Sequence, residues 1–230
     1  MIASHVHALR EGDDAAKMAA ARALGNLAEE TDNQFLIAEA GAIPLFVELL
    51  CDGSAAGKVA AATALCNLAD HGGNQVLIAE AGGIPPLVDL LRDGNADDAK
   101  LIAAWALGNL ACNDDNQVLI AEAHGVPPLV DLLRAGSVED QRQAARALHN
   151  ISYNNDGNAI AIAAAVGLDA LVQLARNGRM TLGRRLSSNV GGPAKRKAAL
   201  VVAALLGGCV PDSARRRVPR VIMAVIGSYL

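Results

Sequence analysis

One short pattern recurs at a nearly constant interval along this chain of 230 residues. A run of alanines followed by Ala-Leu-x-Asn-Leu or Ala-Leu-x-Asn-Ile occurs four times, and its asparagines, Asn26, Asn67, Asn109 and Asn150, are 41, 42 and 41 residues apart. A fixed period of about 42 residues is typical of helical repeat arrays, in which each unit packs only on its neighbours. The spacing therefore predicts one continuous all-α solenoid.

Composition agrees with this prediction. Apolar residues make up 52% of the chain but aromatic residues only 2%, so the core must be built from Leu, Ile, Val and Ala. Alanine and leucine are strong helix formers, and small alanines allow helices to approach closely. No alternating β-branched run persists, so strands are not expected.

One unit can be followed from residue 74 to residue 112. A short helix over 74–81 is broken by two glycines, and a second helix over 84–92 has two prolines in its first turn, where the missing N–H groups cost little. Gly94 follows this second helix, and we expect it in the left-handed conformation that suits glycine at helix C-termini. A third and longer helix is predicted over 96–112.

The same unit maps onto most of the chain. We predict repeats of about 42 residues over 1–177, with a partial first unit because residues 2–10 match a second helix. We expect this partial unit to reflect a truncated gene product. Residues 178–193 are rich in Gly, Ser and Arg and interrupt the period, which predicts an exposed loop insertion. Residues 194–230 are expected to form a divergent last repeat and a C-terminal capping helix.

Charge is distributed unevenly along the chain. Residues 1–175 hold nine Lys and Arg against 23 Asp and Glu, a net charge of −14, whereas residues 176–230 hold 11 Lys and Arg against Asp212 alone, a net charge of +10. The basic part offers an alternative site for acidic partners or nucleic acid, although nucleic acid is unlikely because no aromatic residues interleave for base stacking. Ser187 follows two arginines and is a possible phosphorylation site.

Several functional classes find no support in the residues. We see no transmembrane segment, signal peptide or myristoylation start. The four cysteines form no CxxC pair and are read as reduced thiols, which favours a cytoplasmic or nuclear location. His, Cys and carboxylate residues show no ligand spacing, and there is no phosphate loop or activated nucleophile. We therefore expect no metal, no cofactor, no small-molecule substrate and no catalytic residues.

The combination of motifs resembles the armadillo repeat. The resemblance rests on Gly-Ile-Pro or Gly-Val-Pro junctions followed downstream by Ala-Leu-x-Asn-Leu, and it covers about five units. It implies a right-handed superhelix whose third helices line a concave groove that holds extended peptides. Trp105-x-x-x-Asn109 is similar to the groove motif of importin-α, while the other units carry Arg22, Thr63 and Arg146 at the Trp position.

The repeated asparagines have two possible roles. An Asn side chain offers one acceptor and two donors, which is what pairing with the backbone of an extended peptide requires. Gly25 and Gly108 precede two of them and are expected to leave the approach open. The alternative is that each Asn ties neighbouring repeats together. The predicted peptide-binding residues are Arg22, Asn26, Thr63, Asn67, Trp105, Asn109, Arg146 and Asn150.

The predicted function is that of a non-enzymatic scaffold that binds an extended protein segment. One alternative is an importin-α-like receptor for basic nuclear-localisation peptides, favoured by Trp105, Asn109 and the acidic array. The other is an adaptor for acidic peptides like β-catenin, favoured by Arg22, Arg142 and Arg146. The sequence leaves both open.

Overall fold

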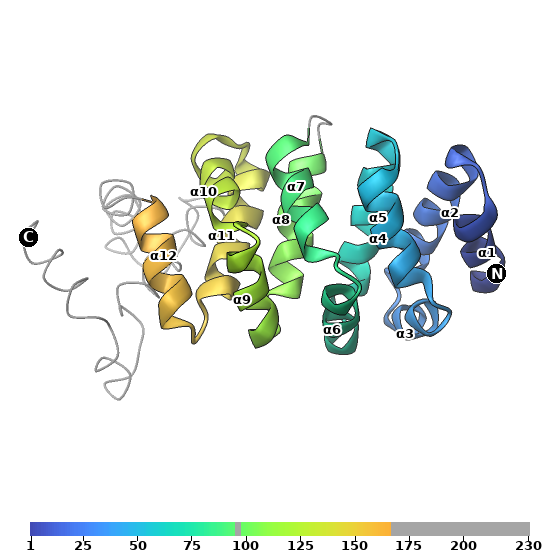
Figure 1. The fold of residues 1–230 in the computed structure, drawn as a ribbon, viewed down its shortest axis with the longest axis horizontal. Coiled ribbons are helices and arrows are strands. Elements are labelled where there is room, and N and C mark those ends of the chain that lie inside the picture. The colour runs from blue at the N-terminus through green and yellow to red at the C-terminus, as the bar shows by residue number, and fades with distance from the viewer. Residues whose placement is uncertain (95–97, 167–230) are drawn as a thin grey trace, which may run out of the picture.

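The computed structural model describes residues 1–94 and 98–166, and in them twelve α-helices stack in an elongated row (Figure 1). Their bounds are α1 Ile2–Glu11, α2 Asp14–Leu27, α3 Thr31–Glu39, α4 Ala42–Asp52, α5 Ala55–Leu68, α6 Gly72–Glu80, α7 Ile84–Asp93, α8 Ala99–Leu110, α9 Asp114–Glu122, α10 Val126–Ala135, α11 Val138–Ser152 and α12 Asp156–Val166. The predicted loop 178–193, the predicted segment 194–230 and Ser187 lie outside the described residues.

The helices form three parallel rows. The first helices of the units are α3, α6, α9 and α12, the second helices are α1, α4, α7 and α10, and the third helices are α2, α5, α8 and α11. In every row each helix contacts its equivalent in the next unit. The predicted all-α solenoid is therefore confirmed. It comprises a partial unit, three complete units and the start of another, which agrees with the predicted count of about five.

The junction between first and second helices is a sharp corner. Helices α3 and α4 meet at 84°, and the residue between them, Gly41, has φ +75°. Gly82 and His124 occupy the equivalent place with φ +77° and +59°. This left-handed conformation ends the first helix, and prolines in the first turn of α7 and α10 begin the second helix at the positions that need no N–H donor.

The glycines after the second helices contradict the expectation of a left-handed C′ residue. Gly53, Gly94 and Gly136 have φ of −71°, −61° and −73°, values that any residue can adopt, so φ does not explain why glycine is needed there. They are needed for space instead, because a Cβ atom at Gly53 would lie 2.4 Å from the carbonyl oxygen of Leu49. The chain turns so tightly against the last helical turn that only glycine fits.

The third helices pack closely because small residues line their contacts. Leucines of the recurring motif, such as Leu65 and Leu107, are fully buried, which contributes about 1.5–3 kcal/mol each. A Cβ atom at Gly25 would lie 3.4 Å from the Cα of Ala64 in the next third helix. Gly25 and Gly108 are thus buried under the following helix. The prediction that they leave an approach open for a ligand is therefore wrong.

Close packing buries the carboxyl ends of the third helices, whose last carbonyl groups have no helical partner. Amide side chains of the following first helix satisfy them. Asn116 Nδ2 donates to the carbonyl of Leu110 at 3.1 Å and also to that of Gln75 in the preceding first helix at 3.0 Å. Asn74 and Asn158 make the same pair of bonds, and Gln34, Gln75 and Gln117 cap the next carbonyl.

The glycine finding leads to a test by two matched substitutions. Gly53→Asn should lower the free energy of unfolding by about 1–3 kcal/mol, because the new Cβ overlaps the Leu49 carbonyl. Gly41→Asn should cost less than about 1 kcal/mol, since asparagine tolerates left-handed backbone and no atom lies within 4 Å of the new Cβ. Urea unfolding followed by circular dichroism measures both. Equal stability of the two variants would contradict the steric explanation.

A second test concerns the first-helix asparagines. Asn116→Ala should destabilise the fold by about 1–3 kcal/mol, since its amide is buried and donates to two carbonyl groups of the preceding unit. Asn33→Ala is the matched control, because among the described residues the Asn33 side chain donates only to Leu27 of the preceding third helix and is partly exposed. Its loss should be about 0.5–1.5 kcal/mol. Thermal and urea unfolding give the comparison, and a larger loss for Asn33→Ala would refute this explanation.

Candidate functional site

The eight predicted site residues lie on the four third helices, two on each helix at positions four apart, and we call them the third-helix face. Side-chain bonds bring three of them together, because Arg146 donates to the Trp105 carbonyl and to Asn109 Oδ1. Asn67 and Asn150 instead donate to backbone carbonyls of the preceding third helix. Among the described residues, the other three make no side-chain bond to another helix. Arg22 and Asn26 are exposed on α2, and Thr63 donates to the carbonyl of Val59 in its own helix.

The asparagines form a ladder through the described array. Asn67 Nδ2 donates to the carbonyl of Gly25 at 3.0 Å, and Asn150 Nδ2 donates to the carbonyl of Gly108 at 2.8 Å. Asn109 makes the equivalent bond to the carbonyl of Cys66 at 3.0 Å. Each acceptor lies in the last turn of the preceding third helix. The inter-repeat role is therefore present in the free protein, and a peptide would have to use what remains of each side chain.

Asn109 has the most complete set of partners. Besides the Cys66 carbonyl, its Nδ2 lies 2.7 Å from Asp70 Oδ1, and its Oδ1 accepts from an Arg146 terminal nitrogen at 2.5 Å. Only 5% of Asn109 is exposed. Asn67 and Asn150, by contrast, are half-buried, and the structure gives their Oδ1 atoms no bond among the described residues. The free hydrogen-bonding capacity therefore lies at Asn67 and Asn150.

Arg146 covers Trp105. The guanidinium carbon lies 5.9 Å from the centroid of the indole ring, and a terminal nitrogen donates to the Trp105 carbonyl at 3.2 Å. This distance is within the range of a cation–π interaction. Trp105 is nevertheless 41% exposed, as its position on the motif predicts. Arg146 Nε is buried and has no partner among the described atoms.

The charges around Asn109 are partly removed from water. Burial lowers the pKa of Arg146, while the neighbouring Asp70 carboxylate acts in the opposite sense. Burial also raises the pKa of Asp70, an effect that Arg146 partly offsets. The pKa of the Cys66 thiol is raised to about 12, first by burial and then by Asp70. Cys66 therefore stays protonated at neutral pH and acts as a packing residue, not as a nucleophile.

Sequence reasoning missed Asp70 and the amide side chains that cap the third helices. Asp70 follows Asn67 by three residues, and its equivalent in the next unit is Cys112, whose sulfur lies 3.5 Å from Asn150 Nδ2. No periodic signal marks this position, because its residue type changes from unit to unit. The capping amides could have been found from the sequence, because an Asn-Gln pair recurs near the start of three first helices. The sequence pattern indicated only that this pair belongs to a helix.

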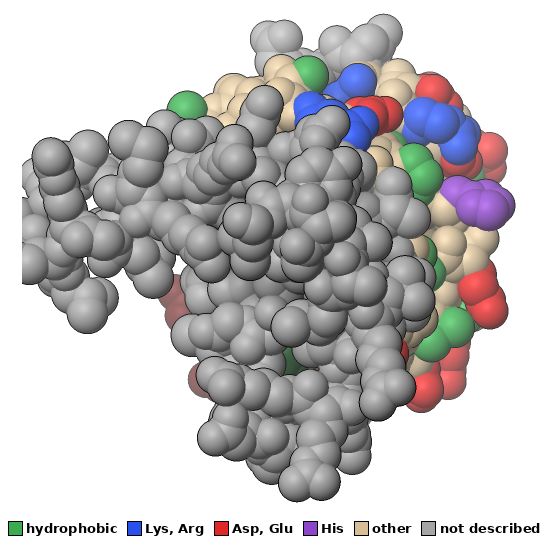
Figure 2. Space-filling model, turned by 90° about the vertical axis from the view of Figure 1, so that its left-hand side faces the viewer, with side chains coloured by type: hydrophobic (Ala, Val, Ile, Leu, Met, Phe, Trp, Pro, Cys, Tyr) green, Lys and Arg blue, Asp and Glu red, His purple; other side chains and the backbone are tan. Residues whose placement is uncertain are grey.

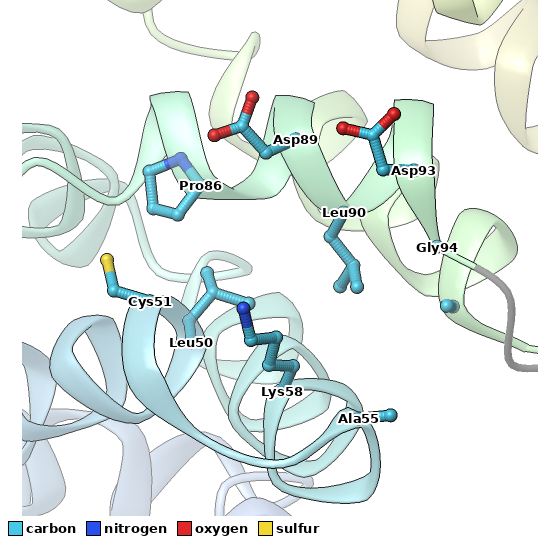
Figure 3. A pocket seen from close by; sticks show the side chains of 10 residues that line it. Leu50, Cys51, Ala55, Lys58, Pro86, Asp89, Leu90, Asp93 and Gly94 are labelled. Atoms are coloured by element: carbon cyan, nitrogen blue, oxygen red, sulfur yellow. The ribbon is translucent and has the colours of Figure 1, made fainter.

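A separate pocket of about 340 Å³ lies between two units, at the ends of their second helices. Asp89 and Asp93 of α7 stand on one wall, and Lys58 of α5 and Cys51 lie across from them (Figure 3). Burial and the Asp52 carboxylate raise the pKa of Cys51, which disfavours its thiolate. None of the eight predicted residues lines this pocket, so it is not part of the third-helix face.

The described residues offer neither a single membrane-spanning helix nor a metal-binding cluster. Among residues 1–94 and 98–166 no helix alone has the length and apolar character to cross a bilayer, and only α3 with α4 reaches that composition as a bent pair. In the same residues no group of three or more His, Cys, Asp and Glu is placed to hold a metal ion.

Several designed or engineered proteins of known structure are similar to this chain. A designed armadillo repeat protein matches with a TM-score of 0.77 and 25% identity, covering 96% of this chain and 87% of its own. Another, in complex with peptide (KR)4, matches with a TM-score of 0.70 and 25% identity over 97% and 98%. An engineered protein reaches 32% identity and a TM-score of 0.78, with 94% of this chain and 50% of its own covered.

The family assignment comes from the sequence of the repeats themselves. A search of curated protein sequences finds no match. The model of the armadillo/beta-catenin-like repeat matches residues 31–70, 73–112 and 113–153, and these three stretches coincide with the three complete units of the structure. Together they make up more than half of the sequence. The chain therefore belongs to the armadillo repeat family.

Proposed function

We propose that this protein is an interaction scaffold that binds an extended polypeptide along the third-helix face and prefers acidic segments. The single observation that carries the proposal is the cluster of Trp105, Arg146 and Asn109, where an exposed aromatic ring and a half-buried cation share one surface. Aromatic and arginine side chains with this environment commonly anchor protein partners. The designed relative in complex with peptide (KR)4 supports a peptide as the class of ligand.

The spacing of the asparagines suits an extended ligand. Packed helices lie about 8–10 Å apart, while an extended chain advances about 3.3 Å per residue. One Asn per unit thus meets about every third peptide residue. In the free protein the bond to the preceding third helix uses one N–H of Asn67 and one of Asn150, and Cys112 Sγ also lies 3.5 Å from Asn150 Nδ2. Asn67 keeps a second N–H, and both side chains keep the Oδ1 acceptor. These groups are available to a peptide backbone without breaking the ladder.

The charges favour an acidic ligand. The face carries Arg22 and Arg146, and the nearby Arg142, one turn before Arg146, is paired with Glu139 within its own helix. The Arg146 guanidinium already lies over the ring of Trp105. A lysine or arginine of a ligand would have to displace this guanidinium, whose positive charge would repel it. A ligand carboxylate would instead be attracted by the half-buried Arg146 guanidinium.

The alternative is a receptor for basic peptides, and two observations favour it. The motif Trp105-x-x-x-Asn109 is the feature shared with importin-α, and a structural relative was solved with peptide (KR)4. In this case Arg146 would move away and a basic side chain would take its place on Trp105. Asp70 would then supply the carboxylate.

Binding of two labelled peptides separates these alternatives. We expect an extended Asp/Glu-rich peptide to bind the wild type more tightly than (KR)4 in fluorescence anisotropy at physiological salt. Arg146→Thr, which installs the residue found at Thr63, should weaken the acidic peptide about tenfold, roughly 1.4 kcal/mol. The same change should strengthen (KR)4, because it exposes the Trp105 ring and removes the competing charge.

Two variants serve as controls for this experiment. Trp105→Ala should weaken whichever peptide binds, because it removes the aromatic anchor, and it should leave the melting temperature nearly unchanged given its exposure. Val138→Thr, an exposed position on the same helix as Arg146, should leave binding as it is. Tighter binding of (KR)4 than of the acidic peptide to the wild type would support the alternative, and failure of both peptides would refute the scaffold proposal.

A further inference from the structure

A second surface stands out on the first helices. Two adjacent apolar side chains are exposed at the same position of three successive helices: Phe35 and Leu36 on α3, Val76 and Leu77 on α6, and Val118 and Leu119 on α9, with exposed fractions from 40% to 56%. These helices contact one another in series and lie along the lower edge of the array in Figure 1. The six side chains therefore form one apolar stripe that crosses three units.

The stripe has acidic borders. An exposed glutamate follows each pair at the end of its helix: Glu39, Glu80 and Glu122. Asp32 and Asp115 are exposed at the other end of α3 and α9, and none of the three helices contains Lys or Arg. The ion pairs of the described residues use none of these five carboxylates. In the end-on view of Figure 2 the visible Lys and Arg side chains lie in the upper part of the molecule, whereas acidic side chains are also visible in its lower part.

We infer that this stripe is a docking surface for a basic amphipathic helix of a partner protein. Exposed apolar residues scattered singly need no explanation, but a continuous row of large ones is typical of interaction sites. The acidic borders select a ligand whose apolar side is flanked by Lys or Arg, since complementary charges speed association and exclude like-charged partners. An extended peptide fits less well, because its side chains alternate every two residues.

The repeat spacing matches the periodicity of a helix. Seven residues of an α-helix advance about 10.5 Å, close to the distance of about 8–10 Å between neighbouring packed helices. An apolar residue in each heptad of the ligand can therefore meet one apolar pair in each unit. Three pairs span about 20 Å, so a helix of about 18 residues reaches the whole stripe. The stripe weakens beyond α9, where α12 places Ala161 at the position of Leu119.

The test uses the full-length protein and two synthetic helical peptides of about 18 residues. Both carry Leu at the a and d positions of the heptad, and the remaining positions are mainly Lys in one peptide and mainly Glu in the other. We expect the Lys peptide to bind at least tenfold more tightly than the Glu peptide in anisotropy titrations. It should also gain helicity on binding, as seen by circular dichroism.

Substitutions then locate the site. The double variant Val76→Gln with Leu77→Gln should weaken the Lys peptide at least tenfold, whereas Val138→Gln, at an exposed position of α11, should leave it unchanged. The pair Glu80→Lys and Glu122→Lys should reverse the preference toward the Glu peptide. All four positions are exposed, and the charge pair keeps the test valid even if the double variant loses stability.

Trp105→Ala separates this inference from the proposed function. It should leave binding of the Lys peptide intact; if it abolishes that binding, the peptide sits on the third-helix face and the stripe is not its site. Equal binding of both peptides, or no effect of either set of substitutions, would overturn the inference. So would a concentration-dependent dimer of the wild type that the change at Val76 and Leu77 dissociates, because the stripe would then serve self-association.

Discussion

The arrangement of this solenoid depends on the carbonyl groups at the carboxyl end of each third helix. These groups have no partner inside the helix, and close packing of the next unit keeps them from water. Amide side chains provide the missing donors: one from the following third helix, as Asn109 does for Cys66, and others from the following first helix, as Asn74 and Gln75 do for Leu68 and Ala69. Units are thereby joined by directional bonds in addition to apolar packing.

This requirement limits which side chains can serve a ligand. Asn109 uses both N–H groups and its oxygen within the protein, so its replacement would disturb the structure and binding together. Asn67 and Asn150 retain unused groups, and Trp105 presents its ring without carrying a hydrogen bond of the core. Arg146 connects the two kinds of residue, because it completes the set of bonds of Asn109 and also covers Trp105. Under the proposed function, the charge of a ligand would therefore act on the bonds of Asn109 through Arg146.

Sequence periodicity predicted the fold because each unit repeats the same apolar and turn residues at one interval. The three-helix unit, the short first helix and the exposure of Trp105 are all confirmed by the structure. The burial of Asn109 could not be predicted, since it depends on Asp70 and Arg146 from two other units. The role of Gly94 differs from its prediction for a similar reason, because φ preference and lack of space both select glycine, and only the structure distinguishes them.

The ladder also explains how successive units can differ on their outer surfaces. The inter-repeat bonds of the third helices end on backbone carbonyls, so the acceptor is present whether the residue is Gly25, Cys66 or Gly108. The side chain four positions before each Asn takes no part in the bond from that Asn to the preceding helix. This position can therefore be Arg, Thr or Trp without loss of the bond. A repeat array of this kind can therefore hold its units together through the main chain while the side chain at this position changes from unit to unit.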